Sequence, residues 1–389
     1  MPFRIVPFPA KPETSPDGLM IHFADLPDHR VKRGLRHKLS DIVFPAVCAT
    51  ASGADDWVAA EVFCNAKLDR FRKYPELPNG IPSHDTFGEV FRYLDTAAFE
   101  GCFRARMAEI CPTAGRPHVA FDGKTMRSSG SAERRALHVV GAFAAANGVT
   151  PGQRAVGAES NEITAIPELL ETPAIAGAIV TTDAVGCQEE IAGAIRRRKA
   201  HYLLAVEGNQ PTLHDEIEAH FGKHLESDFA GVATAFCEST ERNRGRVEYR
   251  SCGVFSDVGF LSGKDGWKDL QSVVVVVTDR REKGRSTSEI RYYIRSRKAT
   301  AAVLAAAIRD HRGAENNLHW HPDVTFGDDD SRVRGGNGAE NCARIKRLAL
   351  SILTNAGGEE SLAKKRLAAC ASDDRRELMI REFLDIPED

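Results

Sequence analysis

Two apolar stretches of this chain each lead directly into an aspartate, and no other feature constrains the fold as strongly. Val119–Phe121 leads into Asp122, and the stretch 177–182 (GAIVTT) leads into Asp183. Short apolar runs beside Gly and polar residues are typical of buried strands, so each carboxylate should lie where a sheet meets solvent or a ligand. The 61 positions from the first aspartate to the second accommodate two more strands and a helix. We therefore expect both aspartates on adjacent strands of one sheet.

The elements around these aspartates occur in the order of a mixed α/β sheet. Three strands come first, and the dipeptide Asn147-Gly148 closes the last two into a hairpin. A helix, a strand, a second helix and another buried strand follow, at 162–172, 177–183, 188–199 and 201–206. Neighbouring parallel strands in such sheets present their carboxyl ends at a shared ligand site. The pattern thus predicts an α/β fold with the aspartates at that edge.

The segments on either side of this sheet differ in character. Residues 35–112 have the pattern of helices, for example 87–94, whose apolar side chains recur with helical spacing after a Ser83 N-cap. Residues 208–298 are β-rich and basic, and the α/β pattern resumes with an alanine-rich helix over 299–320. The sequence therefore predicts an independent N-terminal all-helical domain and a β-rich insertion in the sheet domain.

Composition excludes several classes of protein. The nine cysteines are scattered without a C-x-x-C pair, which indicates reduced thiols in a cytoplasm and argues against a zinc ribbon. Prolines interrupt the N-terminus where a signal peptide needs an unbroken apolar stretch, and no later segment has the length of a membrane span. We expect a cytoplasmic protein without membrane contact.

The basic residues are clustered although the formal net charge is −3. Any one basic island is explained by a solvated protein face, whereas five together are compatible with a surface that binds a phosphate backbone. The islands are 29–38, 196–199, 242–246, 280–285 and the set Arg332, Arg334, Arg344, Lys346 and Arg347.

Glu315 is the candidate for a third carboxylate, because it lies in a helix that can pack across the strand ends. Two or three carboxylates and a phosphate oxygen suit Mg²⁺, a hard cation that prefers oxygen ligands. Two such ions could activate a nucleophile and stabilise the leaving oxygen of a phosphoryl transfer. Each aspartate also has a structural interpretation: Asp122 could cap a turn, and Asp183 could be the N-cap of the helix after it.

Other motifs have competing interpretations. Asp279 follows an apolar run but opens a charged turn, and a solvated loop explains Asp328–Asp330 better than a cation site does. His319 and His321 are residue types that suit zinc, but H-x-H is a weak signal. The glycine-rich stretch 332–341 could hold a phosphate at a helix N-terminus, although it lacks the spacing of an ATP-binding loop.

Several blocks of the sequence resemble the DDE transposases of bacterial insertion sequences, in particular the H-repeat-associated group. They occur in the family's order from about residue 25 to 355, and they include NGIPSHDTF, FDGKTMRSS, SNEITAIPELL, TTDAVGCQEEIA and ENNLHWHPDVTFGDDDSR. The resemblance implies a ribonuclease H-like mixed sheet whose catalytic, metal-binding triad is Asp122, Asp183 and Glu315. It also implies two Mg²⁺ ions, for which Mn²⁺ could substitute. The chain differs from the family at Glu207, where Lys is common, and at Arg312, where Trp is usual.

With this resemblance the chain divides into six segments. They are a proline-rich leader (1–24), an N-terminal helical domain with DNA contacts (25–115), the first part of a catalytic core (116–207), the β-rich basic insertion (208–298), the second part of the core with the Glu315 helix (299–356) and a charged C-terminal tail (357–389).

The resemblance implies a transposase that cleaves phosphodiester bonds at element ends and joins the 3′-hydroxyls to double-stranded target DNA. A homodimer is expected, because two element ends must be brought together. The predicted DNA contacts are Lys124, Arg242, Arg244, Arg246, Arg250, Arg312, Arg332 and Arg334. One alternative is a transposase-derived DNA-binding protein without catalysis. A more distant alternative is a zinc hydrolase built on His319 and His321.

Overall fold

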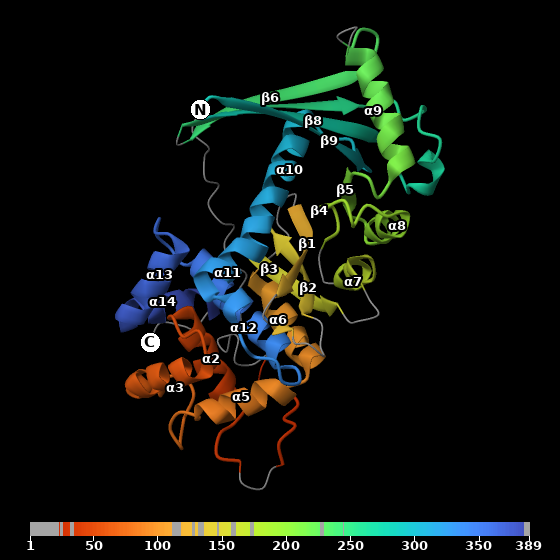
Figure 1. Cartoon of the computed structure of the whole chain (residues 1–389). Coiled ribbons are helices and arrows are strands. Elements are labelled where there is room, and N and C mark those ends of the chain that lie inside the picture. The colour runs from red at the N-terminus through yellow and green to blue at the C-terminus, as the bar shows by residue number, and fades with distance from the viewer. Residues whose placement is uncertain are drawn as a thin grey trace.

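A computed structural model describes residues 23, 26–31, 35–110, 118–126, 129–130, 136–145, 148–156, 161–171, 175–225, 229–243 and 245–384. The described residues form one nine-stranded sheet with helices on both faces and a group of helices at one end (Figure 1). No described helix is both long enough and apolar enough to cross a membrane.

The sheet is mixed, as the order of elements in the sequence predicts. Its spatial order is β3-β2-β1-β4-β5-β9-β8-β7-β6, in which β4 pairs in parallel with β1 and with β5 and the other neighbours are antiparallel. The strands are β1 (His118–Met126), β2 (Leu137–Ala144), β3 (Val149–Val156), β4 (Ile179–Thr182), β5 (His201–Val206), β6 (Thr234–Asn243), β7 (Arg246–Phe255), β8 (Ser272–Glu282) and β9 (Arg285–Arg295). The β2-β3 hairpin is confirmed, and Gly148 of its turn has a φ of 63°, whereas Asn147 lies outside the described residues.

Helices cover both faces of the sheet because alternate strand residues are apolar on both sides. On one face, Phe121 and Tyr202 lie in a core with apolar residues of α7, α8 and α9. On the other face, Leu203 and Val274 pack against α10, which crosses the sheet in Figure 1. These helices are α7 (Glu162–Leu169), α8 (Glu189–Arg197), α9 (Pro211–Leu225) and α10 (Ala301–Glu315).

Strands β6 to β9 extend the central sheet, and the predicted insertion is therefore not a separate β-region. β9 pairs with β5 from Leu203↔Arg295 to Val206↔Tyr292, since the edge of β5 offers unpaired backbone groups. The insertion also begins with a helix, α9, that covers the extended sheet. Asp279 lies inside β8 rather than at its end, because the β8-β9 turn is formed by Lys283 and Gly284, both with positive φ.

The N-terminal helices share one hydrophobic core with the C-terminal helices. Phe44 and Phe91 belong to the same buried cluster as Leu348 of α12, Ala369 of α13 and Ile380 of α14. The structure therefore differs from the expected independent N-terminal unit and peripheral C-terminal tail, because α12 is the surface on which both pack. These helices are α2 (Ser40–Ala51), α3 (Trp57–Ala66), α4 (Leu68–Phe71), α5 (His84–Tyr93), α6 (Thr96–Ile110), α11 (His321–Phe326), α12 (Gly338–Asn355), α13 (Leu362–Ala371) and α14 (Asp373–Leu384).

Candidate active site

Asp122 and Asp183 lie next to each other where the parallel ladder between β1 and β4 ends. The last pair of this ladder is Phe121↔Thr182, and an aspartate directly follows each of these residues. The prediction that the aspartates follow neighbouring strands is confirmed for β4, which ends at Thr182. Asp122, however, does not end its strand, because pairing with β2 continues to Met126.

Neither aspartate has the structural role that the sequence left open. Asp122 lies inside a strand and accepts a hydrogen bond from the backbone nitrogen of Gly123 at 2.9 Å, so it does not cap a turn. Asp183 accepts a hydrogen bond from the backbone nitrogen of Gly186 at 3.3 Å, whereas the N-cap of α8 is Gln188. Both carboxylates thus lie at the edge of the sheet without the capping roles that the sequence suggested.

Helix α10 brings Glu315 to the same edge. Ala314 and, in the π-helical turn η3 (Asn316–Trp320) after it, Leu318 belong to an apolar cluster with Ala120 of β1. A side chain at Gly141 would come within 2.9 Å of Leu318, so this glycine allows the helical segment to approach the sheet closely. Glu315 is the last residue of α10 and is exposed.

The three predicted acids line one cavity of about 270 Å³. Glu207 also lines it and directly follows β5, so three adjacent strands carry a carboxylate at or just beyond the edge. From the sequence, Glu207 is noted only as a difference from the family. The apolar run HYLLAV leads into Glu207 just as GAIVTT leads into Asp183, so the same pattern could have identified it. The other charged or ionisable side chains of the lining are Arg291, Tyr293, His311, Arg312 and His319.

The electrostatics of Asp183 indicate that this edge fits a cation. Burial raises the pKa of Asp183 to about 6, and the negative charge of Glu162 contributes next, ahead of Asp122 and Glu207. Like charges beside a half-buried carboxylate disfavour its ionised form, and a cation would relieve that repulsion. The ligand atoms offered are carboxylate oxygens, which suit Mg²⁺ or Mn²⁺.

The two histidines of the zinc interpretation do not converge. Nε2 of His319 lies 3.0 Å from Oδ2 of Asp122, whereas the ring of His321 packs edge-on against Trp320 with 4.7 Å between centroids. Their positions do not favour a zinc site. In the described part of the chain, one cluster of possible metal ligands has its ligand atoms within 4.8 Å of one another. It consists of His214, Asp215 and Glu218, on the surface of α9.

Lys124 does not fit its predicted role as a DNA contact. Its side chain is 5% exposed and forms ion pairs with Asp323 and, at 3.5 Å, with Asp328. Asp328 is itself buried and lies 3.0 Å from Lys346, so the solvated loop that we expected for the acidic run 328–330 is wrong for Asp328, whereas Asp330 is exposed. These charges hold β1, α11 and α12 together.

The basic residues of α12 are also interior, in contrast to the predicted island. Arg344 is 3% exposed and donates to Glu100 at 2.7 Å, and Arg347 donates to the carbonyl of Leu318 at 2.9 Å. Helices from both ends of the chain surround α12, so its polar face has no access to solvent. Arg344, Lys346 and Arg347 therefore do not form a DNA-binding surface.

Two other basic islands come together at the far end of the long strands. Arg242 and Arg281 are both paired across the sheet with Val247, which joins the islands 242–246 and 280–285. Arg242, Arg246, Arg281 and Arg285 are exposed there. Arg250 lies further along β7, where it pairs with Glu248 at 2.5 Å and Glu241 at 3.1 Å. The predicted contact Arg244 lies outside the described residues.

Arg312 lies in the wall of the candidate site. Its guanidinium is 3.9 Å from Glu289 of β9, and it lines the same cavity as Glu315. Arg332 and Arg334 are exposed in the segment before α12. They stay predicted DNA contacts, as does Arg312.

The glycine-rich stretch before α12 is occupied by protein rather than open to a phosphate. The backbone nitrogen of Asn337 donates to the carbonyl of Arg92 at 2.9 Å, and the side chain of Asn341 donates to Leu94 at 3.0 Å. A side chain at Gly336 would meet the Arg92 carbonyl oxygen at 2.5 Å. The stretch therefore docks the start of α12 on the end of α5.

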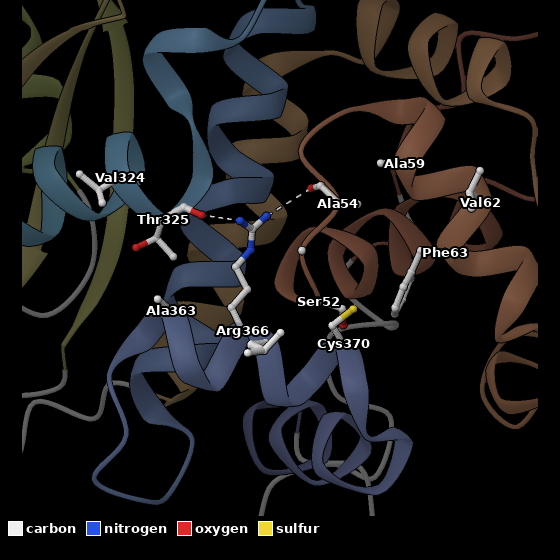
Figure 2. Close-up of a pocket in the computed structure, with 12 residues that line it drawn as sticks. Ser52, Ala54, Ala59, Val62, Phe63, Val324, Thr325, Ala363, Arg366 and Cys370 are labelled. Carbon is white, nitrogen blue, oxygen red and sulfur yellow. Dashed lines mark hydrogen bonds between the residues drawn. The ribbon is translucent and has the colours of Figure 1, made fainter.

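A second, larger cavity has a different chemical character. It measures about 540 Å³ and is lined mainly by apolar side chains of α3, α11 and α13, including Phe63, Val324 and Leu367. Figure 2 shows Arg366 between the carbonyls of Thr325 and Ala54, to which it donates hydrogen bonds. The lining includes no carboxylate, so this cavity is not a second candidate active site.

Comparisons with known proteins identify the family of this chain. A family model described as "Transposase DDE domain" matches residues 113–352, and one described as "DDE_Tnp_1-associated" matches residues 20–107. "Putative transposase YncI" of Escherichia coli O157:H7 is 40% identical over 89% of this chain and 91% of its own length. "H repeat-associated putative transposase YhhI" of Escherichia coli K12 is 37% identical over 91% of this chain and 95% of its own length.

The chain is also similar to a solved structure, but this similarity is too low to support the family assignment. It is the cryo-EM structure of a piggyBac transposase synaptic complex with hairpin DNA, with a TM-score of 0.42 and 10% identity over 95% of this chain and 77% of that chain. The family match spans most of the chain, and the strands and helix that carry the predicted acids lie inside it. The protein belongs to the DDE transposase family, together with the H-repeat-associated transposases.

Proposed function

We propose that this protein is an insertion-sequence transposase that cuts DNA strands at the element ends and joins the freed 3′-hydroxyls to target DNA. One observation carries the proposal. Asp122, Asp183 and Glu315 come from β1, the end of β4 and the end of α10, and all three line one cavity. We further propose that β1–β5 with α7, α8 and α10 form a ribonuclease H-like core.

In this proposal Asp122, Asp183, Glu207 and Glu315 hold two divalent cations, of which Mg²⁺ is the natural choice. Bound there, the cations would neutralise charge on the phosphate and make water a better nucleophile. Water attacks the phosphorus, the bond to the 3′-oxygen breaks, and a 3′-hydroxyl and a 5′-phosphate result. The 3′-hydroxyl then attacks a target phosphodiester in the same way. The side chains hold the reacting groups in line, which is the main catalytic contribution of a protein to phosphoryl transfer.

Arginines beside the acids supply the charge that brings DNA to them. Arg291 and Arg312 line the cavity with the carboxylates, and guanidinium groups bind phosphate oxygens in a bidentate manner. Arg242 and Arg246 would contact the duplex further away, at the tips of the long strands. Two element ends must be held at once, and we therefore propose a homodimer on DNA.

The proposal assigns a function to four of the six predicted segments. Residues 25–115 contribute DNA contacts, 116–207 and 299–356 the catalytic core, and 208–298 the extension of the sheet. We also propose a cytoplasmic location, which the scattered cysteines without a C-x-x-C pair support.

A strand-cleavage assay tests the proposal. The substrate is a duplex that carries the DNA flanking the gene, and the protein is added with Mg²⁺ or with EDTA. We expect nicking at one position of each inverted repeat with Mg²⁺ and none with EDTA. Binding of the duplex without cleavage, with either Mg²⁺ or Mn²⁺, would favour the alternative of a DNA-binding protein without catalysis.

A further inference from the structure

Glu162 places another carboxylate beside β1 next to Asp122, on the face of the sheet opposite α10. It is the first residue of α7, and its side chain is 17% exposed. A Cβ at Gly123 would lie only 2.0 Å from Oε1 of Glu162, so the absence of a side chain there makes room for the carboxylate. Gly123 directly follows Asp122, and Glu162 therefore lies beside the backbone of the first predicted acid.

Two residues of the sheet fix the orientation of this carboxylate. Nε2 of His138 lies 2.8 Å from Oε1 of Glu162, and Nδ1 of the same ring lies 2.8 Å from the hydroxyl of Thr125. An ionised carboxylate only accepts hydrogen bonds, so Nε2 donates to Glu162, and Nδ1 shares a hydrogen bond with the Thr125 hydroxyl. His138 and Thr125 face each other across the β1-β2 ladder, which ties Glu162 to the strand that carries Asp122.

Helix capping does not explain this arrangement. An acid in the first turn of a helix is favourable, but α7 already has a complete capping box between Asn161 and Thr164. Glu162 instead lies beside Gly123, the residue after Asp122, and both carboxylate side chains are sheltered, with 17% of Glu162 and 14% of Asp122 exposed. Repulsion between two sheltered carboxylates destabilises a fold unless a cation lies between or beside them.

We propose that Glu162 is a fifth carboxylate of the predicted divalent-cation site, in addition to Asp122, Asp183, Glu207 and Glu315, and that His138 positions it. The inference rests on the proposed function, since the cation is the one that Asp122 and Asp183 would hold. Glu162 then raises the affinity of the site for the cation, and it does so from the face of the sheet opposite α10.

Mn²⁺ binding to the full chain, measured by isothermal titration calorimetry without DNA, tests this inference. Glu162→Gln is the main variant, because glutamine can still accept the hydrogen bond from His138 but lacks the charge. Its matched control is Glu168→Gln, on the same helix, where the half-exposed carboxylate pairs with Arg154 at 2.5 Å. Asp183→Asn is the reference variant. We expect E162Q to raise the Kd for Mn²⁺ about tenfold or more, and E168Q to leave it unchanged.

Thermal unfolding without metal separates a role in the site from a structural role. We expect the midpoint of E162Q to equal or exceed that of the wild type, since a like-charge repulsion is removed. A lower midpoint together with weaker binding would make Glu162 a structural residue and overturn the inference. Wild-type Mn²⁺ affinity in E162Q, with binding lost in D183N, would also overturn it while the proposed function stands. Unchanged binding in D183N would instead refute the cation site itself.

Discussion

Phe121 and Thr182 form the last pair of the parallel ladder between β1 and β4, and an aspartate follows each of them. The register of this ladder therefore brings Asp122 and Asp183 side by side although they are far apart in the chain. A slip of one residue would send one carboxylate to the opposite face of the sheet. The ladder has four residue pairs, and those pairs set the relative position of the two central acids.

DNA binding should depend steeply on salt. Each neutralised phosphate contributes about −0.9 to the slope of log affinity against log salt concentration. Replacing Arg242 and Arg246 with Ala should make the slope shallower by up to about 2, measured by fluorescence anisotropy from low to moderate salt, without a change in Mn²⁺ binding. Arg154→Ala, at the opposite edge of the sheet, is the control and should keep the wild-type slope. A flat salt dependence of the wild type would contradict a surface that binds phosphates.

Arg312→Trp introduces the residue that the family usually carries at this position. The guanidinium is 3.9 Å from Glu289 rather than paired with Glu315, which favours a contact with DNA phosphate over competition with the cation. We expect weaker DNA binding and slower strand cleavage, each by about tenfold, which corresponds to the loss of one charge-assisted contact. Tighter Mn²⁺ binding and faster cleavage would instead mean that Arg312 competes with the cation. If neither changes, Arg312 has no role in the site.

Asp328 should be essential for stability. It is 2% exposed between the ammonium groups of Lys124 and Lys346, so Asp328→Asn leaves two buried cations without their shared partner. We expect the free energy of unfolding to fall by about 3–5 kcal/mol, measured by urea denaturation. Asp330→Asn, an exposed residue in the same turn, should change it by less than about 0.5 kcal/mol. A small effect of D328N would mean that water reaches this ion cluster.

The motif FDGK illustrates what the sequence can and cannot predict. The strand and its neighbour could be predicted, because apolar runs and turn residues are local signals. The glycine and lysine after Asp122 could not be assigned, because their partners are distant in the chain. Gly123 leaves room for Glu162, and Lys124 pairs with Asp323. Because the sequence does not show these partners, Lys124 is predicted from the sequence to be a DNA contact.

The buried charges of α12 were missed for a related reason. Its apolar spacing predicts one buried stripe, and Arg344 and Arg347 lie outside that stripe. The helix is nevertheless enclosed on all sides, because the N-terminal helices, α13, α14 and β3 all pack on it. Enclosure of this kind depends on the tertiary arrangement, which a single-sequence pattern does not contain.

Stability should fall as the pH decreases below 7, in part because of His118. Burial, with a smaller contribution from His311, lowers the pKa of His118 to about 3, and its Nε2 shares a hydrogen bond with Thr181 at 2.8 Å. Below its ordinary pKa of about 6.5 the unfolded chain binds a proton that the folded chain excludes, so this contribution is present above 6.5 and is lost as pH falls toward 3.

Between pH 7 and pH 5, His118 alone should account for a loss of about 2 kcal/mol in the free energy of unfolding. His118→Gln keeps a nitrogen near the position of Nε2 and should reduce the pH dependence by about that amount in urea titrations. His29→Gln, at an exposed position, serves as the control. An unchanged pH dependence in H118Q would show that His118 is protonated in the folded protein.

Strand cleavage by variants of the three acids tests the central claim most directly. Asp122→Ala, Asp183→Ala and Glu315→Ala are compared with the wild type and with Asp279→Ala, an exposed strand acid away from the cavity. The substrate is the duplex with the flanking inverted repeats in Mg²⁺, and far-UV circular dichroism and DNA affinity are measured in parallel. The account predicts that each of the three variants folds and binds DNA but cuts at least a thousandfold more slowly, while D279A cuts normally. Mg²⁺-dependent cleavage at the wild-type rate in any of the three would contradict it and remove that residue from the site.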